Sequence, residues 1–237
     1  MRAVRYSAAT HRGKVRQINE DSLLSLPDQG VWTVSDGMGG HHGGDFASQT
    51  VTEALAMLPL ELSADRIVFS VRQAMSAAHH AIQRERERRG VEMIGATVVV
   101  LTLVEGRYSI LWSGDSRVYR LRAGELEMLT SDHSAVGEFV RAGKMTWEEA
   151  DQQPYANQII RAIGVGDEVE LDVVEGWIQP GDRFLLCSDG LTKYADSHLL
   201  RAVLSTSGIE KVSDKLLQIA LDGGGDDNVS LIVVEVP

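Results

Sequence analysis

Aspartates that follow short apolar runs are the residues of this 237-residue sequence best suited to chemistry. Asp36 follows residues 31–35 and precedes a glycine-rich bend, Asp189 follows residues 183–188, and Asp115 comes after a run that ends in Ser-Gly. A short apolar run is typical of a buried strand, and glycines let backbone and ligand approach closely. We therefore expect three strands to direct their carboxylates to one place.

Three further acidic residues extend this set. Glu20 and Asp21 end a basic loop, and Asp227 stands before the last apolar run. Carboxylates that share a site repel one another and raise each other's pKa, so protons or cations must neutralise them. Oxygen donors without Cys or His at ligand spacing favour a hard cation, Mg²⁺, Mn²⁺ or Ca²⁺. Any one of these aspartates alone is better explained as a helix cap or an Asx turn, but together they favour a metal site.

A pair of such cations supports phosphate chemistry. Two ions about 4 Å apart activate water as hydroxide and neutralise phosphate oxygens. Arg16, five residues before Asp21, offers a bidentate clamp for the phosphate. A lone arginine in a basic loop is usually only a surface residue, and its neighbourhood favours the clamp here.

The surrounding pattern predicts an α+β fold in one domain, residues 1–237. Antiparallel hairpins outnumber βαβ crossovers, which favours helices packed outside sheets. A segment at about 132–163 interrupts the β pattern and is interpreted as a lid, a flap or inert packing. We expect strands near 4–9, 23–26, 31–35, 96–104, 108–112, 117–122, 126–129, 171–174, 183–187 and 229–236, and helices over 46–58, 64–89, 136–140, 146–153, 198–204 and 209–220.

Composition limits the partners and the cellular compartment that we expect for this protein. A net charge of −11 argues against nucleic acid or an anionic membrane as the partner. A single cysteine excludes a disulfide framework and suits a reducing cytosol. The sequence has neither a signal peptide nor an apolar run of about 20 residues, so we expect a cytoplasmic protein without a membrane anchor. The arginine-rich run 84–89 is interpreted as a solvated last helical turn.

Six short motifs in order resemble the metal-dependent protein serine/threonine phosphatases, often called the PPM or type 2C (PP2C) family, and its bacterial single-domain type in particular. The resemblance covers nearly the whole chain, and each motif is weak alone. They are Arg16-Gln17-Ile18-Asn19-Glu20-Asp21, Asp36-Gly37-Met38-Gly39-Gly40-His41, Gly95-Ala96-Thr97, Gly114-Asp115-Ser116-Arg117, Ser188-Asp189-Gly190-Leu191-Thr192 and Asp227-Asn228-Val229.

The resemblance implies a central β-sandwich of two mainly antiparallel sheets flanked by helices in α-β-β-α layers, with two Mn²⁺ or Mg²⁺ ions at one end. Asp36 would bridge the metals and the Gly37 carbonyl would bind one of them, while Asp189 and Asp227 would complete the other site.

Further roles follow from the same resemblance. Asp21 and Glu20 would hold metal-bound waters, and Asp115 with Asp189 matches a third site that bacterial members often occupy. Arg16 would grip the substrate phosphate. Phosphorylated proteins are the implied substrates, and a cognate Ser/Thr kinase pathway is the implied partner.

One departure concerns the general acid. Animal members carry a histidine where this chain has Met38, so protonation of the leaving group falls to a water or to His41 or His42. We favour His41 as a catalytic and substrate-binding residue, although a solvated loop histidine is the plain alternative.

Two other functions remain open at this point. One is a pseudophosphatase that binds phosphoproteins without hydrolysing them, and the other is an enzyme for small phosphomonoesters. The motif spacings do not match a cysteine phosphatase, a dinucleotide loop or a P-loop.

Overall fold

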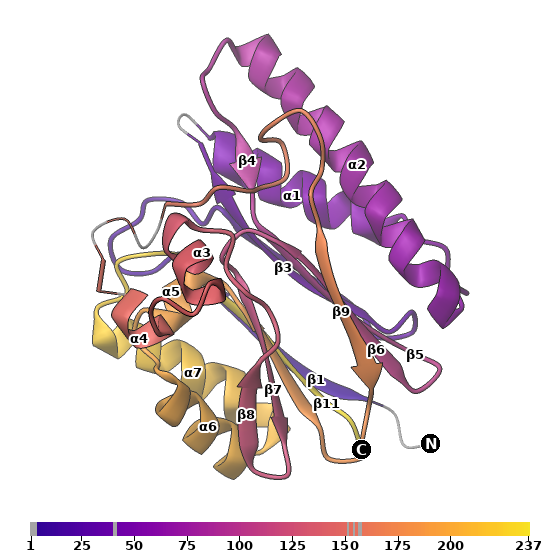
Figure 1. The fold of residues 1–237 in the computed structure, drawn as a ribbon, viewed down its shortest axis with the longest axis vertical. Helices are drawn as coiled ribbons and strands as arrows, with labels where there is room; N and C mark the ends of the chain where they lie inside the picture. Colours follow the sequence, from indigo (N-terminus) through magenta and orange to yellow (C-terminus); the bar gives the residue numbers. More distant parts are fainter. Residues whose placement is uncertain (1–3, 40–41, 151, 154, 156–157) are drawn as a thin grey trace.

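Two antiparallel β-sheets stacked face to face form the centre of the protein (Figure 1). The computed structural model describes residues 4–39, 42–150, 152–153, 155 and 158–237. The first sheet runs β1 (Arg5–His11), β11 (Val229–Glu235), β10 (Arg183–Cys187), β7 (Arg117–Arg122) and β8 (Glu125–Met128). The second runs β2 (Asp21–Leu26), β3 (Val31–Met38), β5 (Val98–Val104), β6 (Arg107–Ser113) and β9 (Asp172–Trp177), with β4 (Gly95–Ala96) paired to β3.

Alternation along the central strands explains the stacking. Successive strand side chains point to opposite faces. In β10, Phe184 and Leu186 therefore lie between the sheets, whereas Leu185 and Cys187 face the helices. Both faces of these strands are apolar because both are covered, and the chain buries three separate apolar clusters, one between each pair of layers.

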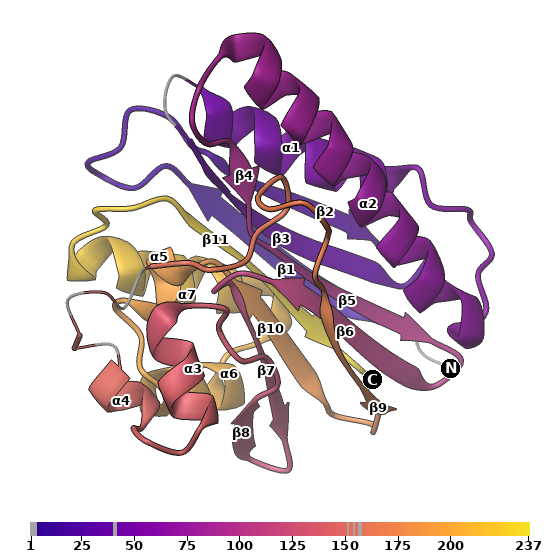
Figure 2. The ribbon, with the colours of Figure 1, turned by 45° about the horizontal axis from the view of Figure 1, so that its top comes forward.

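Helices cover the outer face of each sheet (Figure 2). The second sheet carries α1 (Gly43–Ala56) and α2 (Ala64–Arg89), and the first carries α5 (Asp189–Thr192), α6 (Ser197–Thr206) and α7 (Ile209–Gly223). Ser63 begins α2 with its main-chain carbonyl alone, since its side chain makes no capping hydrogen bond. Gly90 ends the helix at φ 66°, a conformation that glycine adopts without strain.

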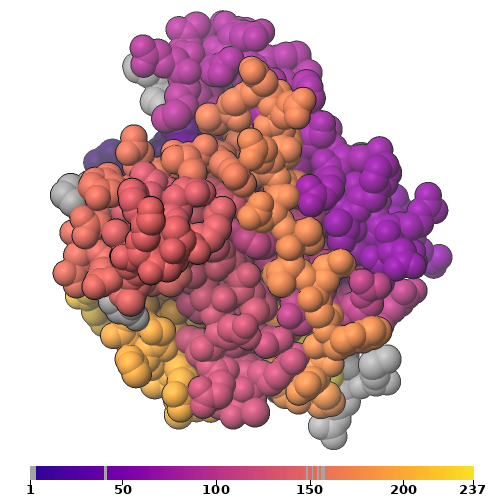
Figure 3. Space-filling view, in the orientation of Figure 1, coloured from indigo at the N-terminus to yellow at the C-terminus, as the bar shows by residue number. Residues whose placement is uncertain are grey.

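The segment between β8 and β9 holds two short helices, α3 (Ala135–Arg141) and α4 (Trp147–Ala150). In the space-filling view this red to orange segment lies on the surface, beside the strand that returns across the front of the molecule (Figure 3). A capping box begins α4: the Thr146 N–H donates to Glu149 Oε2 at 2.8 Å, and the Glu149 N–H donates to Thr146 Oγ1 at 3.3 Å.

The predicted α+β fold with α-β-β-α layers is confirmed, and several bounds differ from expectation: β3 continues past Asp36 to Met38, α1 begins at Gly43, and α4 ends at Ala150. The strand expected over 96–104 is interrupted at Thr97, because Thr97 bonds to Asp36 through both its main-chain N–H and its hydroxyl. The short helix α5 has no counterpart among the predicted elements, since four residues carry no helical periodicity. None of the described helices combines the length and apolar character needed to cross a bilayer.

Candidate active site

The register of the first hairpin brings two of the predicted carboxylates together. β2 and β3 pair so that Asp21 stands directly opposite Asp36. The turn at 27–30 and the buried apolar residues set this register, because a slip of one residue would turn every side chain to the wrong face. Side chains directly opposite in an antiparallel pair have Cβ atoms about 5 Å apart, so the two carboxylates are neighbours.

The end of β10 joins this pair from the other sheet. Ser188 Oγ donates to Asp21 Oδ2 at 3.0 Å and itself accepts from the Ser230 main-chain N–H at 3.0 Å. Asp189 follows Ser188 at the start of α5, and its charge is among those that raise the pKa of Asp36. The two sheets are therefore connected at their carboxylates.

Asp115 reaches the same place from the turn between β6 and β7. It is buried, and burial with the nearby charges of Asp189 and Asp132 holds its pKa well above the usual range. Arg117 offsets part of that rise. The turn depends on Gly114, which has φ 110° and where a Cβ would lie 2.6 Å from the Thr97 side chain.

Asp227 meets the basic loop of residues 12–20. Arg16 Nη2 lies 2.9 Å from Asp227 Oδ2, and this hydrogen bond raises the pKa of the Arg16 guanidinium. Asn228 secures the loop, because its Nδ2 donates to the carbonyls of Arg12 and Ile18 at 3.0 and 2.9 Å while its Oδ1 accepts from the Glu20 N–H. The loop and residues 223–228 lie side by side at one end of the sandwich (Figure 2).

Glu20, Gly37 and the start of α1 form a close contact. A Cβ on Gly44 would lie 2.5 Å from Glu20 Oε1 and 2.7 Å from the Gly37 carbonyl oxygen, so the side-chain and main-chain oxygens face one point. Burial and the charge of Asp45 raise the pKa of Glu20, and a hydrogen bond from the Gly44 N–H lowers it in part. Only glycine leaves the space that these oxygens enclose.

The pKa values of the clustered aspartates are raised. Burial and the surrounding aspartates raise the pKa of Asp36 well above its usual range, and burial raises the pKa of Asp21 to about 7 although Ser230 and Ser188 donate to it. The pKa of Asp189 rises for the same reasons, burial first and the charge of Asp227 next. Asp36 and Asp189 retain some exposed area, but the protein around them desolvates both.

The donor chemistry of this site fits hard divalent cations. The donors are carboxylate and carbonyl oxygens, and Asp21 Oδ1 is buried without a hydrogen-bond partner among the described residues. Mutual repulsion would be relieved by a cation more completely than by a single proton. Within the described part of the chain, no three His, Cys, Asp or Glu side chains are arranged as a ready-made metal-binding group.

The predicted general acid is not placed. His41 lies outside the described residues, as does Gly40. His42 is described: its side chain is exposed, with Nδ1 3.8 Å from Asp45 Oδ2, and its carbonyl accepts from Arg89 Nη1 at 2.8 Å. His42 therefore lies at the first turn of α1 and faces solvent.

The segment 132–163 is tied to the Asp115 turn. Asp132 forms a buried ion pair with Arg117 at 2.8 Å, and the Arg117 guanidinium lies 4.9 Å from the Trp147 ring centroid of α4. The main-chain N–H of His133 donates to the Gly114 carbonyl at 2.9 Å, and its Nδ1 accepts from the Gly114 N–H. This segment therefore borders the carboxylates.

Several positioning residues carried no clear signal in the sequence. Ser188 and Thr97 stand inside motifs, but nothing in their spacing shows that they bond to Asp21 and Asp36. Asp132 stands in a segment without periodicity, so its pairing with Arg117 is visible only in three dimensions.

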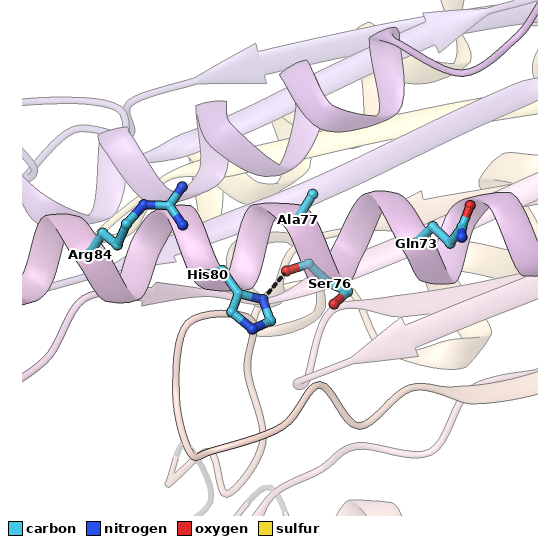
Figure 4. Close-up of a pocket in the computed structure, with 5 residues that line it drawn as sticks. All are labelled: Gln73, Ser76, Ala77, His80 and Arg84. Atoms are coloured by element: carbon cyan, nitrogen blue, oxygen red, sulfur yellow. Dashed lines mark hydrogen bonds between the residues drawn. The ribbon is translucent and has the colours of Figure 1, made fainter.

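A hollow of about 450 Å³ on the outer face of α2 contains none of the predicted site residues. Its lining comes from Gln73, Ser76, Ala77, His80 and Arg84, and His80 Nδ1 lies 2.7 Å from the Ser76 carbonyl (Figure 4). It lies on a helix face directed away from the sheet.

A helix-flanked β-sandwich with acidic oxygens at one end defines the PP2C class of fold. The chain belongs to this family: the profile described as Protein phosphatase 2C matches residues 9–220.

Among its relatives, the serine/threonine protein phosphatase PstP of Mycobacterium tuberculosis is 36% identical over 98% of this chain and 45% of its own length. The serine/threonine phosphatase stp of Listeria monocytogenes is 33% identical over 95% of this chain and 93% of its own length. The chain thus spans less than half of PstP and nearly all of the Listeria protein.

Solved structures of other proteins have folds similar to that of this chain. PppA, described as a key regulatory component of T6SS in Pseudomonas aeruginosa, has a TM-score of 0.90 and 39% identity, with 98% of this chain and 97% of that chain covered. The catalytic domain of PstP in complex with two manganese ions has a TM-score of 0.89 and 35% identity, with 99% of each chain covered.

Proposed function

We propose that this protein is a Mn²⁺- or Mg²⁺-dependent phosphatase that hydrolyses phosphoserine and phosphothreonine on proteins. One observation carries the proposal: Asp21 of β2, Asp36 of β3, Asp115 of the β6–β7 turn and Asp189 of α5 meet at one end of the sandwich, where burial and neighbouring aspartates raise the pKa of each, and Arg16 is paired beside them with Asp227. Family membership and the named phosphatases among its relatives support it.

The residues divide between cation binding and substrate binding. Asp36 and the Gly37 carbonyl would hold one cation. Asp36, Asp189 and Asp227 would hold the second. Glu20 and Asp21 would bind waters of that cluster, and Asp115 would serve a third ion. When bound, such ions lower the pKa of water and neutralise phosphate oxygens.

Arg16 is the residue that we assign to the phosphate. Its side chain is half exposed and needs only to leave Asp227 to present two parallel N–H groups to phosphate oxygens. Water then attacks phosphorus, the bond from phosphorus to the seryl or threonyl oxygen breaks, and that oxygen takes a proton. Met38 cannot supply the proton, and His41 remains the predicted donor.

The test is hydrolysis of an aryl phosphate and a phosphothreonine peptide with Mn²⁺ and with a chelator. We expect both activities to require the cation and to be lost in Asp36→Ala and Asp189→Ala, whereas Asp214→Ala, which changes an exposed aspartate of α7, keeps them. Activity that survives chelation or either site substitution refutes the metal mechanism.

The same assay separates the two alternatives. A pseudophosphatase would bind the phosphopeptide with no turnover of either substrate. A small-molecule enzyme would turn over phosphorylated metabolites faster than phosphopeptides. His41→Ala should reduce peptide hydrolysis more than aryl phosphate hydrolysis, because a seryl alkoxide is the poorer leaving group.

We infer a single catalytic domain over 1–237 with a flap at about 132–163 that contributes to substrate choice. A cytoplasmic Ser/Thr kinase whose products this enzyme reverses is the expected partner. Phosphoproteomic comparison of cells with and without the gene tests that partnership.

A further inference from the structure

Basic side chains alternate along the loop next to Asp227. Arg12, Lys14 and Arg16 are all exposed, and Val15 between them is 64% exposed, so the loop has no cover on this side. In a chain with net charge −11 such a run is a local exception. It borders the residues assigned to the phosphate and the cations.

The loop is held firmly against Asp227. The Lys14 N–H donates to the Gly225 carbonyl at 2.6 Å, and Asn228 Nδ2 donates to the Arg12 carbonyl. Gly13 has φ 77°, and a Cβ there would lie 2.1 Å from the Asp227 carbonyl oxygen. Main-chain contacts therefore fix where the side chains of Arg12 and Lys14 begin, while both side chains extend into solvent.

The charges of these two side chains are not neutralised locally. In the part of the chain that the structure describes, Arg12 and Lys14 form no ion pair, and Arg12 donates only to the Gln17 carbonyl at 3.3 Å. The neighbouring Asp226 does not cancel them, because its carboxylate is engaged by Lys193 at 2.7 Å and by the Tyr194 hydroxyl. Arg16 differs, since it pairs with Asp227.

We propose that Arg12 and Lys14 form a substrate-recognition rim that selects phosphoserine and phosphothreonine sites flanked by acidic residues. The inference rests on the proposed phosphatase function and adds a substrate class to it. Residues two apart in an extended peptide are about 6.6 Å apart, which flexible Arg and Lys side chains span. A peptide whose phosphate reaches Arg16 would thus present flanking carboxylates to the rim.

The test compares two phosphothreonine peptides of equal length that carry either Glu or Gln at the flanking positions. Each exposed ion pair is expected to be worth about two- to fivefold in kcat/KM, so the wild type should prefer the Glu peptide by about four- to twenty-fivefold at low salt. In about 1 M salt, where the Debye length is about 3 Å, the preference should disappear.

Charge variants identify the source of the preference. Arg12→Gln/Lys14→Gln should bring the ratio of kcat/KM for the two peptides close to one, and Arg12→Glu/Lys14→Glu should invert it. Lys14→Gln alone removes charge without removing a described side-chain hydrogen bond, and should lose about half of the effect. The control Arg66→Gln/Lys211→Gln changes the net charge equally at exposed sites elsewhere and should keep the preference.

The outcomes separate this inference from the proposed function. Equal turnover of both peptides by the wild type, or a preference that survives in Arg12→Gln/Lys14→Gln, overturns the rim while leaving the phosphatase intact. If neither peptide nor an aryl phosphate is hydrolysed with Mn²⁺, the proposed function fails and the rim with it.

Discussion

Removal of divalent cations is expected to make the folded protein progressively less stable as the pH rises. Burial raises the pKa of Asp21 to about 7 in the folded chain, whereas an unfolded aspartate titrates near 3.9. The folded state therefore binds a proton that the unfolded state has released. That contribution to stability is complete below the unfolded pKa and is lost as the pH rises through the folded pKa.

The size of the effect follows from the shift. About three pKa units correspond to roughly 4 kcal/mol, of which about 3 kcal/mol is lost between pH 5 and 8.5. This is a large part of the ~5–15 kcal/mol that stabilises an ordinary domain. The raised pKa values of Asp36 and Asp189 act in the same direction.

Two buried histidines act in the opposite direction. Burial lowers the pKa of His79 and of His133, so the unfolded state binds protons that these side chains release on folding, and stability rises with pH through about 6.5. The comparison must therefore be made with a variant that retains both histidines. Asp21→Asn is suitable, because it keeps an acceptor for Ser188 Oγ and removes the charge.

The assay is urea unfolding in a chelator, followed by tryptophan fluorescence from pH 5 to 8.5. The wild type should lose about 3 kcal/mol more than Asp21→Asn across this range, and the exposed control Asp214→Asn should follow the wild type. Saturating Mn²⁺ should remove the excess slope, because the cation neutralises the carboxylates in place of protons. Parallel pH profiles for the wild type and Asp21→Asn would refute the reasoning.

Three substitutions test the surrounding contacts. Arg16→Lys retains the charge but loses the planar fork, so kcat/KM for a phosphopeptide should fall about tenfold or more, and an unchanged value would remove Arg16 from the phosphate site. Gly44→Ala places a Cβ 2.5 Å from Glu20 Oε1, and Mn²⁺ affinity measured by titration calorimetry should fall about tenfold or more; full affinity would show that this contact is irrelevant. Asp132→Asn removes the carboxylate charge that pairs with the buried Arg117 guanidinium and should cost about 3–5 kcal/mol in urea unfolding, whereas Glu127→Gln, which breaks the exposed pair with Arg120, should cost less than about 1 kcal/mol; equal costs would contradict the distinction.

Much of the fold could be predicted because its signals are local. The apolar run of β10 and the turn at Gln179–Asp182 are readable in a few residues, and the observed strand begins and ends where it was expected. The same holds for α2, whose inner face repeats with the helical period and whose end coincides with Gly90. The strand interrupted at Thr97 was not predicted, since its cause lies 61 residues away at Asp36.

Residue types alone determined that this chain carries strand-end aspartates, a basic loop with Arg16 and oxygen donors suited to a hard cation. Only the tertiary structure decided which of them meet. The Asp21–Asp36 register, the Ser188 bridge between the sheets and the Arg16–Asp227 pair, 211 residues apart, depend on how the two sheets stack. Side-chain chemistry and periodicity are properties of neighbouring residues, whereas proximity across the sandwich arises from burying three apolar layers at once.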